Sequence, residues 1–150
     1  MANTFTSLHY HVIFSTKNRE PWISHEFENR VWSFLGGIAR ENKMKAIQVG
    51  GMPDHIHLVL GLPASMAISK AVQLIKGGSS KWIKEELPTM RGFAWQDGYG
   101  AFTVSKSNLP DTVGYVQKQA EHHRVKTFQE EFLVFLDRHG IDYNEKYLWD

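Results

Sequence analysis

Hydrophobic and polar positions alternate near the start of the chain, in the stretch LHYHVIFST at 8–16. The even-numbered positions are apolar or aromatic, while His9 and His11 fall on the odd-numbered set. A period of two is typical of a β-strand that turns one face toward a core. The stretch therefore predicts a first strand.

The remaining periodicity divides the chain into further strands and helices. Strands are predicted at 45–50, 54–62 and 99–105, and helices at 23–43, 65–87 and 108–126. Ser24 would cap the first helix. Thr127 and Glu130 match a capping box for a last helix that ends at Gly140.

This order of elements is that of the ferredoxin-like split unit, followed by added helices. We therefore predict an α+β fold with an antiparallel sheet, two helices on one face and C-terminal helices that carry a tyrosine. The length of 150 residues fits a single domain over 1–150. The second face of the sheet is left for a site.

Composition excludes several classes of protein. The chain has no cysteine, so disulfide frameworks and thiolate chemistry are excluded. No apolar run approaches the roughly 20 residues that span a bilayer, and the first residues lack the layout of a signal peptide. We therefore expect a cytoplasmic protein without a membrane partner. The net charge of only +1 favours local or single-strand contacts with nucleic acid over broad neutralisation of a duplex.

Two histidine pairs are candidate metal ligands. His55 and His57 lie on one face of a predicted strand, about 6.5 Å apart, which is close enough to share an ion. His9 and His11 have the same spacing. Such a pair often has only a structural role. The pattern alone does not show which of the two pairs would bind a metal ion.

A polar strip on the predicted helix at 108–126 offers further candidates. At 100° per residue, Tyr115, Gln119 and His122 fall within about 60° of one another, apart from the apolar side. A helix at the edge of a site has this pattern, and so does an ordinary solvated face.

Several motifs together resemble one known family. DHIHLVL at 54–60 and YVQKQ at 115–119 resemble the single-tyrosine HUH transposases of the insertion-sequence-two-hundred type. LHYHVIFSTKNREP, WQDGYGAFTVS, EHHR and YLWD also resemble stretches of that family, in the same order along nearly the whole chain. The family includes domesticated relatives associated with repeated extragenic palindromes.

The resemblance implies roles for four residues. His55, His57 and Gln119 would bind a divalent metal ion, Mg²⁺ or Mn²⁺, through neutral ligands, and Tyr115 would be the catalytic nucleophile. The enzyme would cleave and rejoin single-stranded DNA with hairpins through a 5′-phosphotyrosine, and would act as a homodimer. The resemblance assigns no role to His9, His11, His122 or His123. It also leaves open whether the tyrosine acts with the histidines of its own chain (in cis) or with those of the partner (in trans).

Two other functions remain open at this point. The chain would be a domesticated hairpin-DNA-binding protein that does not mobilise DNA, or a metal-dependent phosphodiesterase that uses water. We further expect Gly114 to permit close helix packing, with helix movement as the alternative. The lysines of the helix at 65–87, Lys76 among them, are DNA contacts or an ordinary solvated face.

Overall fold

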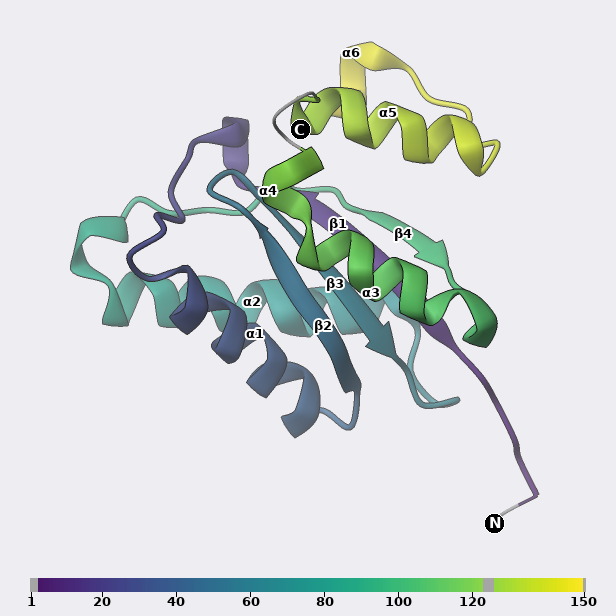
Figure 1. Cartoon of the computed structure of the whole chain (residues 1–150). Coiled ribbons are helices and arrows are strands. Elements are labelled where there is room, and N and C mark those ends of the chain that lie inside the picture. Colours follow the sequence, from purple (N-terminus) through teal and green to yellow (C-terminus); the bar gives the residue numbers. More distant parts are fainter. Residues whose placement is uncertain (1–2, 123–125, 150) are drawn as a thin grey trace.

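A four-stranded antiparallel sheet forms the centre of the computed structural model, which describes residues 3–122 and 126–149 (Figure 1). Its strands are β1 (His9–Ser15), β2 (Lys45–Met52), β3 (His55–Gly61) and β4 (Gly100–Thr103). The strand order is β2-β3-β1-β4, and each strand is antiparallel to its neighbours. This is the ferredoxin-like arrangement predicted from the order of elements.

Helices cover both faces of this sheet (Figure 1). One layer contains α1 (Glu28–Glu41) and α2 (Ile68–Glu86). The other contains α3 (Leu109–Gln117), α4 (Gln119–His122) and α5 (Phe128–Arg138), and α6 (Glu145–Leu148) follows. Short 3-10 turns occupy Lys17–Arg19, Pro88–Met90 and Lys106–Asn108. No helix among the described residues is both long and apolar enough to cross a membrane.

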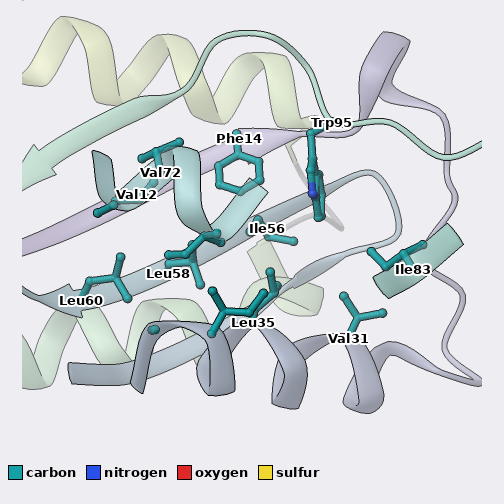
Figure 2. Close-up of a cluster of buried hydrophobic side chains, with 14 of the residues drawn as sticks. Val12, Phe14, Val31, Leu35, Ile56, Leu58, Leu60, Val72, Ile83 and Trp95 are labelled. Atoms are coloured by element: carbon teal, nitrogen blue, oxygen red, sulfur yellow. The ribbon is translucent and has the colours of Figure 1, made fainter. Parts of the chain in front are cut away.

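The main core lies between the sheet and the layer of α1 and α2 (Figure 2). Alternate residues of β1 and β3 supply it from the sheet side, and Phe14, Ile56 and Leu58 are completely buried. Leu35 from α1 and Ile75 from α2 meet them from the other side. Side chains at every second position face this core, which is the physical reason why the strand pattern was readable in the sequence.

The opposite face of the sheet has smaller apolar clusters. Ile13 of β1 and Phe102 of β4 pack against phenylalanines of α5, and Val59 of β3 packs against Leu109 and Val116 of α3. The sequence suggested that this face is open, but α3 and α5 cover part of it. The space between these clusters is where the polar residues of β3, α3, α4 and α5 meet.

Two helix ends test the capping predictions. The box at the start of α5 is present, because Glu130 N donates to Thr127 Oγ1 at 3.2 Å and Thr127 N donates to Glu130 Oε1 at 3.0 Å. The prediction that Ser24 caps the first helix is wrong, because α1 begins at Glu28 and Phe27 occupies the cap position. Ser24 Oγ is buried without a hydrogen-bond partner among the described residues.

The helix predicted at 108–126 is divided in two. Lys118 leaves the helical backbone, with φ −102° and ψ 27°, and separates α3 from α4. Its amide still bonds the carbonyls of Gly114 and Tyr115, at 3.2 Å each, so α3 is closed at this point. The break changes the direction of the chain just before Gln119, whose side chain turns toward β3.

Close packing of α3 depends on Gly50 of β2 and not on Gly114. A Cβ atom at Gly50 would lie 3.0 Å from Val116 Cγ1 and 3.1 Å from Val116 O. A Cβ atom at Gly114 would meet nothing within 4 Å. The expectation that Gly114 permits close helix packing is therefore wrong, because that position of α3 has open space beside it.

These two glycines lead to opposite predictions for alanine substitutions. Gly114→Ala is expected to raise the free energy of unfolding by about 0.5–1 kcal/mol, since alanine favours the helix and loses less backbone entropy. Gly50→Ala is expected to lower it by about 1–3 kcal/mol through overpacking against α3. Urea denaturation of both variants measures the difference. A loss of stability in Gly114→Ala would contradict this account.

Candidate metal centre and tyrosine site

The histidine pair lies at the start of β3, in the middle of the sheet. His55 and His57 are both completely buried and point to the face that α3, α4 and α5 cover. In the register of the sheet, His57 pairs with Ile13 of β1. Because β3 has neighbours on both sides, its backbone holds the two imidazoles at a fixed spacing.

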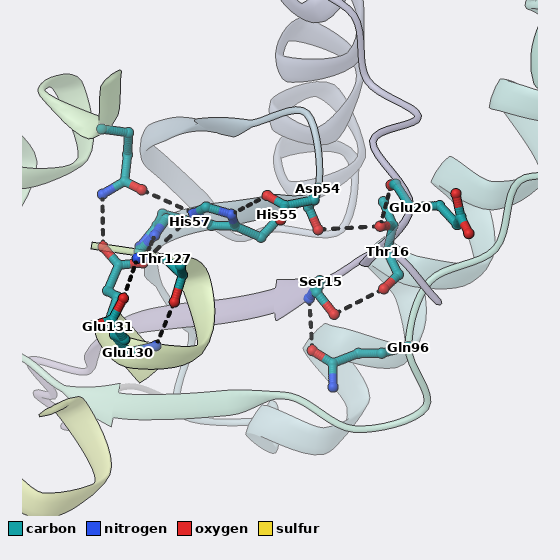
Figure 3. A network of polar contacts seen from close by, with 11 residues as sticks. Ser15, Thr16, Glu20, Asp54, His55, His57, Gln96, Thr127, Glu130 and Glu131 are labelled. Carbon is teal, nitrogen blue, oxygen red and sulfur yellow. Dashed lines mark hydrogen bonds and ion pairs between the residues drawn. The ribbon is translucent and has the colours of Figure 1, made fainter. Parts of the chain in front are cut away.

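Polar groups from α4 and α5 converge on the two imidazoles (Figure 3). Gln119 Oε1 lies 3.1 Å from His55 Nε2. Glu131 Oε1 lies 3.1 Å from His57 Nε2 and 3.6 Å from His55 Nε2. The structure thus brings together the three ligands expected from the sequence and adds Glu131, which the sequence analysis missed.

The donor set fits a divalent metal ion. One ligand atom each from His55, His57 and Glu131 lies within 4.8 Å of the others, and all three side chains are buried. Imidazole nitrogen suits first-row transition metals, and carboxylate or amide oxygen suits Mg²⁺ and Mn²⁺. This group can therefore hold such an ion, and Gln119 adds an amide oxygen beside it.

The second nitrogen of each histidine has its own partner. Asp54 Oδ1 lies 2.7 Å from His55 Nδ1, and His11 Nε2 lies 2.7 Å from His57 Nδ1 (Figure 3 shows the Asp54 contact). In metal sites such contacts fix the tautomer, so that the other nitrogen faces the ion. Asp54 and His11 therefore direct the Nε2 atoms of His55 and His57 toward the converging groups.

His11 acts in this arrangement as a neutral neighbour of the histidine pair. Burial, and next the proximity of His57, lower the pKa of His11 to about 3. A neutral imidazole can accept the Nδ1–H of His57. His9 has a different surrounding, since it is only half-buried and contacts Ser7 Oγ at 3.4 Å. The polar groups converge on His55 and His57, and not on the pair His9 and His11.

Tyr115 reaches the same place from α3. Its hydroxyl donates a short hydrogen bond to Glu131 Oε2, and its ring stacks on His122 with centroids 4.2 Å apart. The ring centroid of His57 lies 6.0 Å away, so the tyrosine faces the histidines of its own chain. Burial, and next the Glu131 carboxylate, raise the pKa of Tyr115 above its usual value. The group is therefore a phenol that donates its proton.

A groove of about 350 Å³ leads to Tyr115 between α3 and α5. Asp111 and Thr112 line it from α3, and Phe135 and Arg138 line it from α5. Arg138 gives the groove a cation, which suits a phosphate group.

Two other expectations do not lead to this site. Lys76 of α2 donates to the carbonyls of Gln96 at 2.7 Å and Gly98 at 2.6 Å, and burial lowers its pKa to about 8. Lys76 therefore ties a loop to α2, on the far face of the sheet, and the expectation of an ordinary solvated face is wrong for it. His123 lies outside the described residues.

One feature of the sequence could have pointed to Glu131. It falls among the apolar positions Phe128, Phe132 and Phe135 of α5, which all face the sheet. A charged residue on the buried face of a helix is rarely tolerated without a partner. That exception to the helix pattern indicates a polar site, although it does not reveal which residues are opposite.

Known proteins resemble this chain in sequence. The sequence model of the family described as "Transposase IS200 like" matches residues 4–119. The ISDra2 transposase TnpA of Deinococcus radiodurans is 29% identical over 117 residues, which cover 75% of this chain and 84% of that protein. The transposase for insertion sequence element IS200 of Salmonella typhimurium is 28% identical over 131 residues, or 83% and 85% of the two chains.

Solved structures give a similar result. A Deinococcus radiodurans crystal structure described as a transposase has a TM-score of 0.67 and 27% identity, and the match covers 79% of this chain and 95% of that one. A REP-associated tyrosine transposase bound to a REP hairpin has a TM-score of 0.59 and 13% identity, over 82% and 73% of the chains. The second match shows a shared fold.

Proposed function

Since this chain belongs to the IS200-like transposase family, we propose that it cleaves and rejoins single-stranded DNA at hairpin-bearing element ends through a 5′-phosphotyrosine on Tyr115. Family membership confirms the resemblance found in the sequence and makes the chain a DNA-processing enzyme. The observation that carries the finer proposal is the hydrogen bond from the Tyr115 hydroxyl to Glu131, whose other carboxylate oxygen contacts His57. Residues 1–150 would form one HUH transposase-like domain.

We propose that His55, His57 and Gln119 hold a divalent ion, Mg²⁺ or Mn²⁺. Support comes from the buried cluster of nitrogen and oxygen donors and from the contacts of Asp54 and His11 behind it. When bound, the ion polarises the scissile phosphate and stabilises the charge that builds on it.

The residues of the chain would divide the reaction into two exchanges. Tyr115 Oη attacks phosphorus, the bond to the 3′ oxygen breaks, and the 5′ end stays linked to the enzyme. The phosphotyrosine keeps the energy of the broken bond, so a 3′-hydroxyl can later reverse the step. The groove between α3 and α5 would admit the strand, with Arg138 close to its phosphates.

A labelled single strand with a hairpin tests this proposal in the presence of Mn²⁺ or Mg²⁺. A strand-transferring enzyme gives a covalent protein–DNA adduct that survives denaturation. A water-using phosphodiesterase gives cut DNA without an adduct, and a domesticated binding protein gives a retained but uncut strand. Either of the last two results would contradict the proposal.

We also propose that the protein acts as a homodimer. The family resemblance suggests it, and Tyr143 and Tyr147 near α6 remain exposed, with Tyr147 at 66%. Leu148 and Trp149 instead pack against α5 of their own chain. Light scattering at micromolar concentration should therefore give twice the chain mass. A monomer both with and without DNA would contradict this prediction.

A further inference from the structure

We infer that Glu131 bridges the metal site and the nucleophile: Oε1 serves as a metal ligand, and Oε2 holds the Tyr115 hydroxyl and receives its proton. This inference rests on the proposed function of the same site. It gives the site a charged group, whereas the family resemblance implied only neutral ligands.

The two oxygens of Glu131 face different partners. Oε1 lies 3.1 Å from His57 Nε2 and 3.6 Å from His55 Nε2, on the side where the ligand atoms converge. Oε2 accepts the hydrogen bond from Tyr115 and lies 3.3 Å from Gln119 Nε2. One carboxylate therefore connects the histidines to the tyrosine, with the amide of Gln119 beside it.

Burial makes this position difficult to explain by packing alone. The Glu131 residue is 2% exposed and lies on the apolar face of α5. An ionised carboxylate at such a position is unfavourable unless it is paired and hydrogen-bonded. A divalent cation beside Oε1 and a phenol donor at Oε2 supply these two conditions together.

Helix α5 holds the carboxylate in place. Phe128 stacks on His55 with ring centroids 4.6 Å apart, and Phe135 meets His11 edge-on at 5.1 Å. The capping box at Thr127 fixes the start of the helix. Glu131 therefore lies between two phenylalanines of α5 that both pack against histidines of the sheet. Helix α5 lies beyond the segment 4–119 that the family model matches.

The proposed step conserves atoms and charge. As Tyr115 Oη forms its bond to phosphorus, the phenolic proton passes to Glu131 Oε2. The bond from phosphorus to the 3′ oxygen breaks, and that oxygen leaves and takes a proton from water. An ordinary tyrosine has a pKa near 10, so an acceptor within hydrogen-bond reach removes the need for a preformed phenolate.

Glu131→Gln tests the bridge, with the adjacent Glu130→Gln as its matched control. Glu130 is exposed and contacts Thr127, where glutamine also completes a capping box. Glu131→Gln should lower Mn²⁺ affinity about tenfold, as for other lost metal-site contacts. It should slow adduct formation at saturating DNA about 100-fold, as for a lost general base. DNA affinity should not change, and Glu130→Gln should alter none of these quantities.

Glu131→Asp is the second variant, since it keeps the charge on a shorter side chain. It should bind Mn²⁺ better than Glu131→Gln and form adduct faster, because part of the bridge remains. Wild-type rates and Mn²⁺ affinity in Glu131→Gln would overturn the inference. Faster adduct formation would also overturn it, because Glu131 would then block Tyr115. If the wild type forms no adduct, the proposed function fails. Independently of that result, unchanged Mn²⁺ affinity in Glu131→Gln would overturn the inference that Glu131 is a metal ligand.

Discussion

Replacing Tyr115 with phenylalanine is expected to abolish both the cleavage of single-stranded DNA and the covalent protein–DNA adduct. The change removes one hydroxyl and keeps the ring, which stacks on His122. Loss of a covalent nucleophile commonly costs about 10⁴-fold or more in rate. Gel assays of adduct and cleaved strand, run on wild type and variant with Mn²⁺, measure the effect.

The same variant should keep its affinity for DNA and for Mn²⁺. Its stability should fall by about 1–3 kcal/mol, because the buried Glu131 carboxylate loses a donor. The position of Tyr115 on a polar helix strip would alone have suggested a smaller change, within about 0.5 kcal/mol. An adduct that persists in Tyr115→Phe would contradict the assignment of the nucleophile.

His57→Ala is expected to remove metal binding and adduct formation together. His57 is completely buried and contacts both Glu131 and His11. Removing a buried side chain and leaving the polar groups opposite it without a partner costs about 1–3 kcal/mol of stability, so His57→Gln, which fills more of the space, is the second variant. Both should lower Mn²⁺ affinity by more than the roughly 10–100-fold that the loss of an outer contact costs, and calorimetric titrations measure this loss.

His9→Ala is the matched control for this change. His9 belongs to the other histidine pair and lies on the same face of the sheet as His57. It is only half-buried, and its ring contacts Ser7. Its removal should leave Mn²⁺ affinity and adduct formation unchanged. Loss of Mn²⁺ binding in His9→Ala, with binding kept in His57→Ala, would move the metal site to the first strand.

The sheet and its order were predictable because they depend on local patterns. Alternation in β1 and β3 determines which side chains face the main core, and the order of strands and helices allows few topologies. The capping box at Thr127 and Glu130 was readable for the same reason, since its two partners are three residues apart. The grouping of His55 with Gln119 also followed from strand and helix periodicity, combined with the family resemblance.

Features that depend on contacts between distant segments were not predictable. Glu131 meets His57 across 74 positions of sequence, and no local spacing encodes that contact. The space around Gly114 depends on where α3 lies against the sheet, so its role could not be read from the helix. Lys76 looked like a surface lysine until the loop at 96–98 was seen to supply carbonyl acceptors.

The break at Lys118 is a related case. A straight helix from 108 to 126 already placed Tyr115 and Gln119 on one side, so nothing in the pattern indicated a break. In the structure the two residues reach the site from separate helices, and Gln119 contacts His55 while Tyr115 contacts Glu131. The periodicity predicted the correct neighbours but a different backbone path.

The most direct test of the account is to identify the amino acid that carries DNA. The wild-type protein is incubated with Mn²⁺ and a hairpin-bearing single strand, and the covalent product is isolated, digested and sequenced by mass spectrometry. The account predicts one modified peptide, with the 5′-phosphate of the cleaved strand on Tyr115. DNA on another tyrosine, with Tyr99 and Tyr10 the next candidates, or cleaved DNA without any linked peptide, would contradict it.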